Sequence, residues 1–350
     1  MFDFGFRKKC SNMELEALEC IRYSRDNDWI EEQHFSLLHK IIFGISSGSL
    51  AAVLREHPNA VYDTDAQGRT ALDWATARAQ LSDMRLLIEH NSNVNTMDVR
   101  GRTTILHAVD SHNDEAVRIL LEAGADPNPK VPDGLFRSSP LKAASFGGRA
   151  EMVKLLLGFG ADINAYNPEG QTALHAAVIS QNVECAGILL EAGASLGDVA
   201  RNGGTPLTLA IIHNSHAVLK LFVDRRYEHV TAVHIERPQV LAVIAEHADT
   251  KTMSIIASSV PLKLSLDPGG DGFGTGREIL RQRSGYDEKL GRAFEELLSS
   301  IAVAKEEFAA FRTADGGEEA HSDISVGQSE GDDHDGGGAA FIDSTAQSPR

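Results

Sequence analysis

The chain has 350 residues, of which 42% are hydrophobic and 24% charged, so it is long enough for two or three domains or for one long array. Its 33 basic and 50 acidic residues give a net charge of −17, which disfavours general binding to nucleic acid or to an anionic membrane. Three scattered cysteines and the lack of an apolar stretch of about 18 residues argue against a disulfide framework, a zinc module and a membrane helix. We therefore expect a cytoplasmic or nuclear protein.

The first 30 residues contain the segment SNMELEALECIRYS, which predicts a helix. We expect residues 1–30 to form an N-terminal cap on the array that follows.

A six-residue pattern that begins with serine or threonine recurs through residues 31–225. Its successive starts are 34, 33, 36, 33 and 33 positions apart, at Ser36, Thr70, Thr103, Ser139, Thr172 and Thr205. A hydroxyl side chain at this point is a favourable helix N-cap. A leucine-rich block such as VRILLEAGADPN follows about ten residues later and ends at a glycine or, in one copy, at Asn91. The period predicts six units, each of two short helices and a loop.

These units resemble ankyrin repeats, because the period, the T-P-L-H-like hexad and the G-A-D-x-N-like helix end agree in consecutive copies. The resemblance implies an all-α solenoid of helix-turn-helix units with short loop fingers. It also implies that His39 and His175, at the fourth hexad position, make structural hydrogen bonds between turns. Other residues replace this histidine in the remaining units, which puts the local bonds in doubt there: Asp73, Leu106, Lys142 and Thr208. The arrangement further resembles the ankyrin-only chains of filamentous fungi.

The resemblance also implies a non-enzymatic scaffold that binds another protein through its loop tips and the concave face of its first helices. No cofactor, metal or small-molecule substrate is expected. The partner-binding residues predicted on this surface are Gln67, Arg69, Arg78, Arg100, Arg102, Leu135, Phe136, Arg137, Phe146, Glu169, Gln171 and Ile179.

Five of these residues are arginines of adjacent units, which favours an acidic or phosphorylated partner segment. The alternative is that they are ordinary solvated loop residues. The segment from Leu135 to Arg137 ends a proline-rich loop that the 36-residue spacing lengthens. Phe136 is either an exposed interface anchor or a side chain that folds back over the next unit.

Enzyme and metal signatures have ordinary structural explanations in this sequence. The glycines at 269–276 lack the register of a dinucleotide-binding motif and the lysine of a phosphate loop, so we interpret them as a turn. His213 and His216 have no cysteine or carboxylate cluster beside them and are interpreted as loop residues. Cys185 lies in an apolar helical context and is predicted to pack in the core.

The repeat pattern decays after residue 225. We expect degenerate or partial repeats in residues 226–285, with a short helix from about Arg277. An apolar residue recurs every three or four positions in residues 286–312, which predicts an amphipathic helix that caps the array. The alternative is that this helix pairs two copies of the chain, which would make the protein a self-assembling subunit.

Residues 313–350 contain nine acidic residues and one basic residue, and we predict a disordered tail there. The tail either lies on the arginines of the binding face or only confers solubility.

Overall fold

The computed structural model describes residues 33–130, 138–224, 237–259 and 272–315. The predictions for residues 1–30, for Leu135, Phe136 and Arg137, and for residues 316–350 lie outside these ranges. The chain divides into two units, Met1–Glu306 and Glu307–Arg350, and the packing described below belongs to the first.

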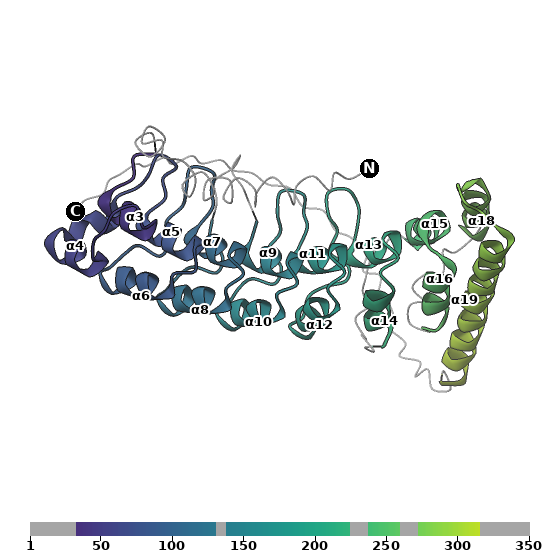
Figure 1. Ribbon diagram of the computed structural model, residues 1–350. Helices are drawn as coiled ribbons and strands as arrows, with labels where there is room; N and C mark the ends of the chain where they lie inside the picture. Colours follow the sequence, from purple (N-terminus) through teal and green to yellow (C-terminus); the bar gives the residue numbers. More distant parts are fainter. Residues whose placement is uncertain (1–32, 131–137, 225–236, 260–271, 316–350) are drawn as a thin grey trace, which may run out of the picture. The chain divides into compact units, whose positions relative to one another are not determined.

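The array consists of consecutive pairs of short antiparallel helices (Figure 1). Each pair has a first helix of six or seven residues and a second helix of seven or nine. The pairs are α3 (Leu37–Ile42) with α4 (Leu50–Glu56), α5 (Ala71–Ala77) with α6 (Leu81–Glu89), α7 (Thr104–Asp110) with α8 (Asp114–Glu122), α9 (Pro140–Phe146) with α10 (Ala150–Gly158), α11 (Ala173–Ile179) with α12 (Val183–Glu191), and α13 (Pro206–Ile212) with α14 (His216–Asp224). A short 3₁₀ helix, η1 (Pro58–Tyr62), follows α4.

The helices form two stacked rows. Each first helix from α3 to α13 contacts the first helix of the next unit, and we call this series the first row. The second helices from α6 to α14 contact one another in the same order and form the second row. Because only isolated β-bridges occur in the described residues, the predicted all-α architecture is confirmed for them.

Local signals set the helix ends where the sequence places them. Thr70 and Thr205 are N-caps whose hydroxyl groups accept hydrogen bonds from the backbone N–H three residues later. Asn91 and Gly124 end second helices with φ values of 63° and 90°, in the left-handed region that asparagine and glycine tolerate best.

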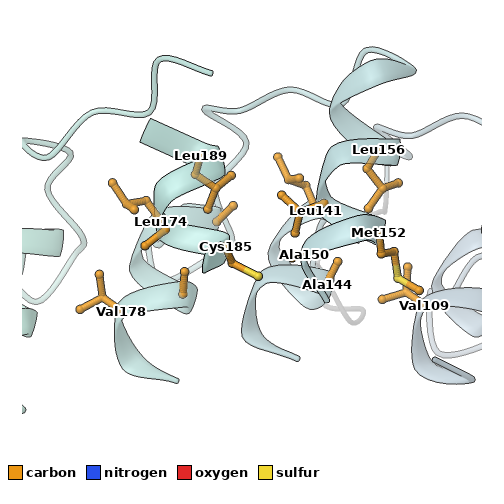
Figure 2. Packing of buried hydrophobic residues seen from close by; sticks show 14 of the residues in the cluster. Val109, Leu141, Ala144, Ala150, Met152, Leu156, Leu174, Val178, Cys185 and Leu189 are labelled. Carbon is orange, nitrogen blue, oxygen red and sulfur yellow. The ribbon is translucent and has the colours of Figure 1, made fainter. Parts of the chain in front are cut away.

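The core lies between the two rows and continues from unit to unit (Figure 2). Leu156 and Leu189 of the second row and Leu174 of the first are fully buried, and burying a leucine side chain contributes about 1.5–3 kcal/mol. The alanine at the sixth position of each hexad after the first is also fully buried, which allows neighbouring helices to approach closely. Cys185 packs in this core as predicted, and burial, with a smaller effect of the Glu184 charge, raises the pKa of its thiol to about 11.

Residues 237–257 form another complete helix pair. Helix α15 (Arg237–His247) contacts α13, and α16 (Thr250–Ala257) contacts α14, so this pair extends both rows. Asp249 is the N-cap of α16 and also bonds His216 of α14 at 2.9 Å. The stacking is therefore more regular here than the decayed sequence pattern predicts.

The interpretation of the glycine cluster as a turn is wrong for residues 272–276, because they lie within helix α18 (Gly272–Gln282). A Cβ atom at Gly276 would lie 3.2 Å from the ring of Phe294 and 3.4 Å from Leu241. Glycine at this position therefore allows α18 to pack closely against its neighbours.

Helix α19 (Glu288–Asp315) has the predicted apolar stripe, and its described part is buried inside the chain. Arg277 of α18 forms two contacts of 2.8 Å with Glu295 of α19. The buried residues are Leu290, Phe294, Leu297, Leu298, Ile301 and Ala304. Tyr286 was predicted to belong to the stripe, but it precedes the helix and is 43% exposed. The helix also continues to Asp315, so the prediction that disorder begins at Thr313 is wrong for residues 313–315.

Candidate functional site

The loop tips of successive units are built by the same turn. Asp65 accepts hydrogen bonds from the backbone N–H of Gln67 at 2.8 Å and of Arg69 at 2.9 Å. Asp98 makes the corresponding pair of bonds in the next tip, both at 2.9 Å. Asn167 accepts a bond of 2.8 Å from the residue four positions later. Because a short side chain fixes the backbone of each tip, the residues between these bonds have defined directions.

Neighbouring tips are also joined backbone to backbone. An N–H of one tip donates to a carbonyl of the preceding tip at 2.8–2.9 Å in three places: Ala66 to Gln33, Val99 to Gln67, and Arg201 to Glu169. These bonds link the first three tips to one another and the tip at Glu169 to the tip at Arg201.

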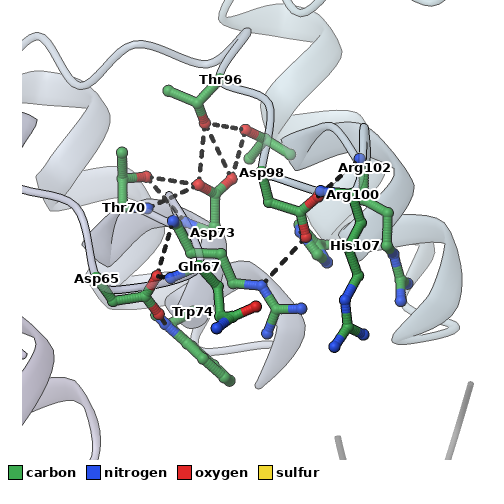
Figure 3. A network of polar contacts seen from close by, with 12 residues as sticks. Asp65, Gln67, Thr70, Asp73, Trp74, Thr96, Asp98, Arg100, Arg102 and His107 are labelled. Atoms are coloured by element: carbon green, nitrogen blue, oxygen red, sulfur yellow. Dashed lines mark hydrogen bonds and ion pairs between the residues drawn. The ribbon is translucent and has the colours of Figure 1, made fainter. Parts of the chain in front are cut away.

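Arg69 differs from the prediction that it is a surface residue. Its side chain is 7% exposed, its Nε lies 3.3 Å from the Oδ2 of the fully buried Asp98 carboxylate, and its guanidinium lies over the Trp74 ring at 4.8 Å. The Trp74 indole donates to Asp65 at 2.8 Å (Figure 3). Arg69 thus connects two tips from inside the array, and its side chain is largely buried rather than exposed at the tip.

The other predicted arginines that the structure describes are either paired within the array or exposed. Arg102 is 11% exposed and pairs with Asp110 at the end of α7, which corrects its prediction as a free surface cation. Arg100 and Arg78 are exposed, and the Arg78 guanidinium lies 5.5 Å above the Phe43 ring. Only Arg78 and Arg100, among the predicted arginines that the structure describes, present an accessible guanidinium.

Asp73 takes over the structural role of the missing histidine in its unit. Its carboxylate accepts hydrogen bonds from the Thr70 N–H at 2.8 Å, the Thr96 hydroxyl at 3.0 Å and the Thr104 hydroxyl at 2.7 Å (Figure 3). Burial raises the pKa of Asp73, because its effect exceeds that of the hydrogen bonds that stabilise the charged form. The local bonds that the substitution put in doubt are therefore present here, and they extend into the next unit.

His39 and His175 make the structural hydrogen bonds that the resemblance implies. The Nδ1 of His39 accepts from the Ser36 N–H at 3.2 Å, and its Nε2 lies 3.0 Å from the carbonyl of Arg69. Since the amide must donate and the carbonyl must accept, Nε2 carries the proton of a neutral ring. His175 makes the same two kinds of contact. Burial lowers the pKa of both histidines below the ordinary value. Their hydrogen bonds within the array give both a structural role.

The buried histidines predict that the array loses stability in mildly acidic solution. Burial, with the nearby charges of Arg102 and Arg69, holds the pKa of His107 well below its usual 6.5. A lowered folded-state pKa means that unfolding takes up a proton, so the stabilisation is complete above about pH 6.5 and is lost as the pH falls. Urea unfolding of His107→Gln at pH 7.5 and 5.5 should show a slope of stability with pH that is shallower by up to about 1.4 kcal/mol per unit.

The exposed His57 provides the control for this experiment, because His57→Gln should keep the slope of the parent chain. The raised pKa of Asp73 acts in the opposite direction, but it is common to both variants and cancels in the comparison. An unchanged slope in His107→Gln would contradict the prediction.

The surface formed by α9, α11 and the tip at Glu169 is more apolar than the surface of the earlier units that carries the arginines. Phe146 is 39% exposed at the end of α9, and Ile179 is half-buried at the equivalent position of α11. Glu169 is exposed at its tip, and Gln171 is half-buried beside it. Among the predicted residues, Gln67 is also half-buried.

Three surface residues escaped the list of predicted binding residues although the repeat could have indicated two of them. Tyr166 and Val199 are 76% and 61% exposed and lie 33 residues apart, each directly before the first residue of a tip. The sequence signal that could have identified them is that both occupy the same position of the repeat. Lys142 is the third, and it is half-buried at the fourth hexad position of α9. Burial lowers the pKa of its ammonium group, and the charge of Glu169 offsets this effect in part.

Within the described ranges, no three His, Cys, Asp or Glu side chains are grouped as metal ligands would be. His216 begins helix α14 and bonds Asp249, as noted above, so its interpretation as a loop residue is wrong, whereas His213 is the C-cap of α13. No helix in this part of the chain has both the length and the apolar character that a membrane span requires.

Known proteins share the repeat region. The Arabidopsis thaliana protein named E3 ubiquitin-protein ligase KEG is 30% identical over 165 residues, which cover 46% of this chain and 10% of that protein. Human Rabankyrin-5 is 30% identical over 196 residues, 48% of this chain and 16% of that protein. Human Ankyrin repeat and SOCS box protein 6 is 36% identical over 134 residues, 36% of this chain and 31% of that protein. The chain thus spans less than a third of the length of each relative.

A family model described as Ankyrin repeats (3 copies) matches residues 33–131 and 141–233. These ranges coincide with the stacked helix pairs from α3 to α14 and cover more than half of the chain. Repeats of this family are generally protein–protein interaction modules and are typically non-enzymatic. The match and the structure agree that this chain belongs to the ankyrin-repeat family.

Proposed function

We propose that the chain acts by binding another protein through its loop tips and the exposed side chains of the first row, and not by catalysis. The partner presents an acidic or phosphorylated segment to Arg78 and Arg100. Arg69 and Arg102 are omitted from the binding set because each is engaged with an aspartate of the array.

The observation that carries this proposal is the position of Arg100. Its backbone is fixed by the Asp98 turn, while its side chain is exposed beside Val99, which is 59% exposed. A guanidinium on a fixed backbone can bind a carboxylate or phosphate through two parallel hydrogen bonds. An exposed apolar neighbour adds contact area at a lower entropic cost, because Asp98 already holds the backbone of this tip. A local basic site of this kind is compatible with the net charge of −17, since long-range steering is weak at physiological salt.

Charge reversal at the two accessible arginines tests the proposal. The full chain and the Arg78→Glu/Arg100→Glu variant serve as baits, and the proteins that the parent chain retains are purified for affinity measurement. We expect binding to the variant to be at least about tenfold weaker at low salt, with a smaller difference at high salt, because exposed charges are screened.

The matched control reverses two exposed basic residues on second helices of their units, Arg55→Glu on α4 and Lys220→Glu on α14. This variant has the same net charge as the test variant and should keep the affinity of the parent chain. Equal losses in both double variants would mean that binding follows net charge alone, and the proposed surface would then be wrong.

The structure does not favour the alternative of self-assembly through the helix at 286–312. The described apolar residues of α19 that were expected to pair two copies are buried within one chain, from Leu290 to Ala304. A capping role is the better account of this stripe.

A further inference from the structure

We infer that Lys142 is a second anchor of the binding surface and receives a carboxylate from a partner segment that carries an apolar side chain close to that carboxylate. This inference rests on the proposed function and deepens it by naming the chemistry of the partner at the second half of the surface. The carboxylate belongs to an aspartate or glutamate of the partner.

The side chain of Lys142 differs from its counterparts in other units. At the fourth hexad position, His39 and His175 bond a carbonyl of the next tip, and Asp73 and Thr208 bond their own N-cap residues. Lys142 donates only its backbone N–H, to Ser139. Its ammonium group has no hydrogen bond and no carboxylate within 4.0 Å among the residues that the structure describes.

Within the described part of the chain, the ammonium group of Lys142 is partly desolvated by burial and has no carboxylate paired with it. Lys142 is half-buried on α9 of the first row, and the charge of Glu169 acts on it without a direct ion pair. An anion that enters such a site is attracted more strongly than at a fully solvated lysine, because less water screens the pair. The site therefore favours a ligand that brings its own negative charge.

The surroundings favour an apolar group beside that charge. Phe146 lies four residues after Lys142 and hence on the same face of α9, and the residue is 39% exposed. Ile179 occupies the equivalent position in the next unit and is half-buried. A partner segment whose carboxylate reaches Lys142 thus places its neighbouring side chains over Phe146 and Ile179, where apolar groups are desolvated favourably.

The charge on the surface favours a carboxylate over a phosphate. A lysine offers one compact charge, whereas a phosphate is held best by the planar fork of an arginine. The negative charge of Glu169, which acts on Lys142 at a distance, also opposes a dianion more than a monoanion. We therefore assign the phosphorylated or strongly acidic part of a partner to Arg78 and Arg100, and the single carboxylate to Lys142.

The test uses Lys142→Met in the full chain, because methionine keeps most of the volume and removes the charge. A random-peptide display library is selected on the parent chain, and the recovered peptides are measured against each variant. We expect these peptides to share an Asp or Glu within four positions of an aromatic or aliphatic residue, and to bind Lys142→Met at least tenfold more weakly. Lys154→Met is the control, because Lys154 is exposed on α10 in the second row and pairs there with Glu151.

A stability measurement separates binding from folding. Lys142→Met should unfold at the same urea concentration as the parent chain or at a higher one, because a half-buried charge without a counter-ion is removed. A lower midpoint would show that the ammonium group already has a partner inside the chain, and it would overturn the inference.

The outcomes also distinguish the two proposals. Peptides that lose affinity for Arg78→Glu/Arg100→Glu but not for Lys142→Met overturn the inference and leave the proposed function standing. Synthetic phosphoserine versions of the recovered peptides that respond to Lys142→Met, when the Asp or Glu versions do not, overturn the choice of a carboxylate. Selection of no peptide, or of peptides that bind all variants equally, counts against the proposed function itself.

Discussion

Replacing Arg69 by methionine is expected to destabilise the array by about 3–5 kcal/mol, because it leaves the buried charge of Asp98 without its cation. Asp98 is completely buried, and without Arg69 it would keep its bonds to the backbone of its own tip and the His107 ring, whose Nε2 lies 3.9 Å from its Oδ2. The loss of the contact with the Trp74 ring adds to the effect. Urea unfolding followed by circular dichroism measures the change.

The double variant Arg69→Met/Asp98→Asn provides the control for this prediction. Asparagine keeps an oxygen that can accept the backbone bonds of the tip, but it carries no charge, so the double variant should recover much of the lost stability. If Arg69→Met instead weakens partner binding and leaves stability within about 0.5 kcal/mol, Arg69 is a binding residue as its sequence position predicts. The experiment therefore decides between a structural and a recognition role for this arginine.

Replacing Phe294 by alanine should destabilise the C-terminal part of the array by about 3–5 kcal/mol. The Phe294 ring is fully buried, and a Cβ atom at Gly276 would lie only 3.2 Å from it, so α18 and α19 meet at this ring. We expect a lower urea midpoint for the last helices, with no change of molecular mass in light scattering. The mass distinguishes a cap from a contact between two copies of the chain.

Val303→Ala is the matched control on the same helix. Val303 is 52% exposed, so its truncation should change stability by no more than about 0.5 kcal/mol. A parent chain that scatters as a dimer and becomes a monomer in Phe294→Ala, with unchanged stability, would contradict the capping role and restore self-assembly as the better account.

The repeat region was predictable because its signals are local and recur. Thr70 caps α5 through its own hydroxyl, and Asn91 ends α6 in the left-handed region, so each residue acts on a backbone within a few positions of itself. Comparison of successive copies then fixes the register, since the same residue types return every 33–36 positions. The later pair α15 and α16 was harder to predict, because its helices stack on α13 and α14 with few of the hexad residues that mark the earlier units.

The candidate site was only partly predictable. Position in the repeat correctly placed Arg69, Arg100 and Arg102 at loop tips, but it gave all three the same role. Their accessibility depends on residues of other units or other helices: Asp98 lies 29 positions after Arg69, and Asp110 lies in α7 opposite Arg102. Lys142 was noticed only as a departure from the histidine pattern, because the absence of a paired carboxylate among the described residues can be seen only once the neighbouring unit is in place.

The amino-acid sequence alone specifies the period, the helix ends, the leucine-rich blocks and the family. These features follow from short-range capping and from the apolar spacing that stacked helix pairs need to exclude water. The tertiary structure decides which charged side chains form ion pairs within the array and which are exposed to solvent. That choice follows from the pairing of groups distant in sequence, as when Asp98 takes the guanidinium of Arg69 and leaves Arg100 exposed at the same tip.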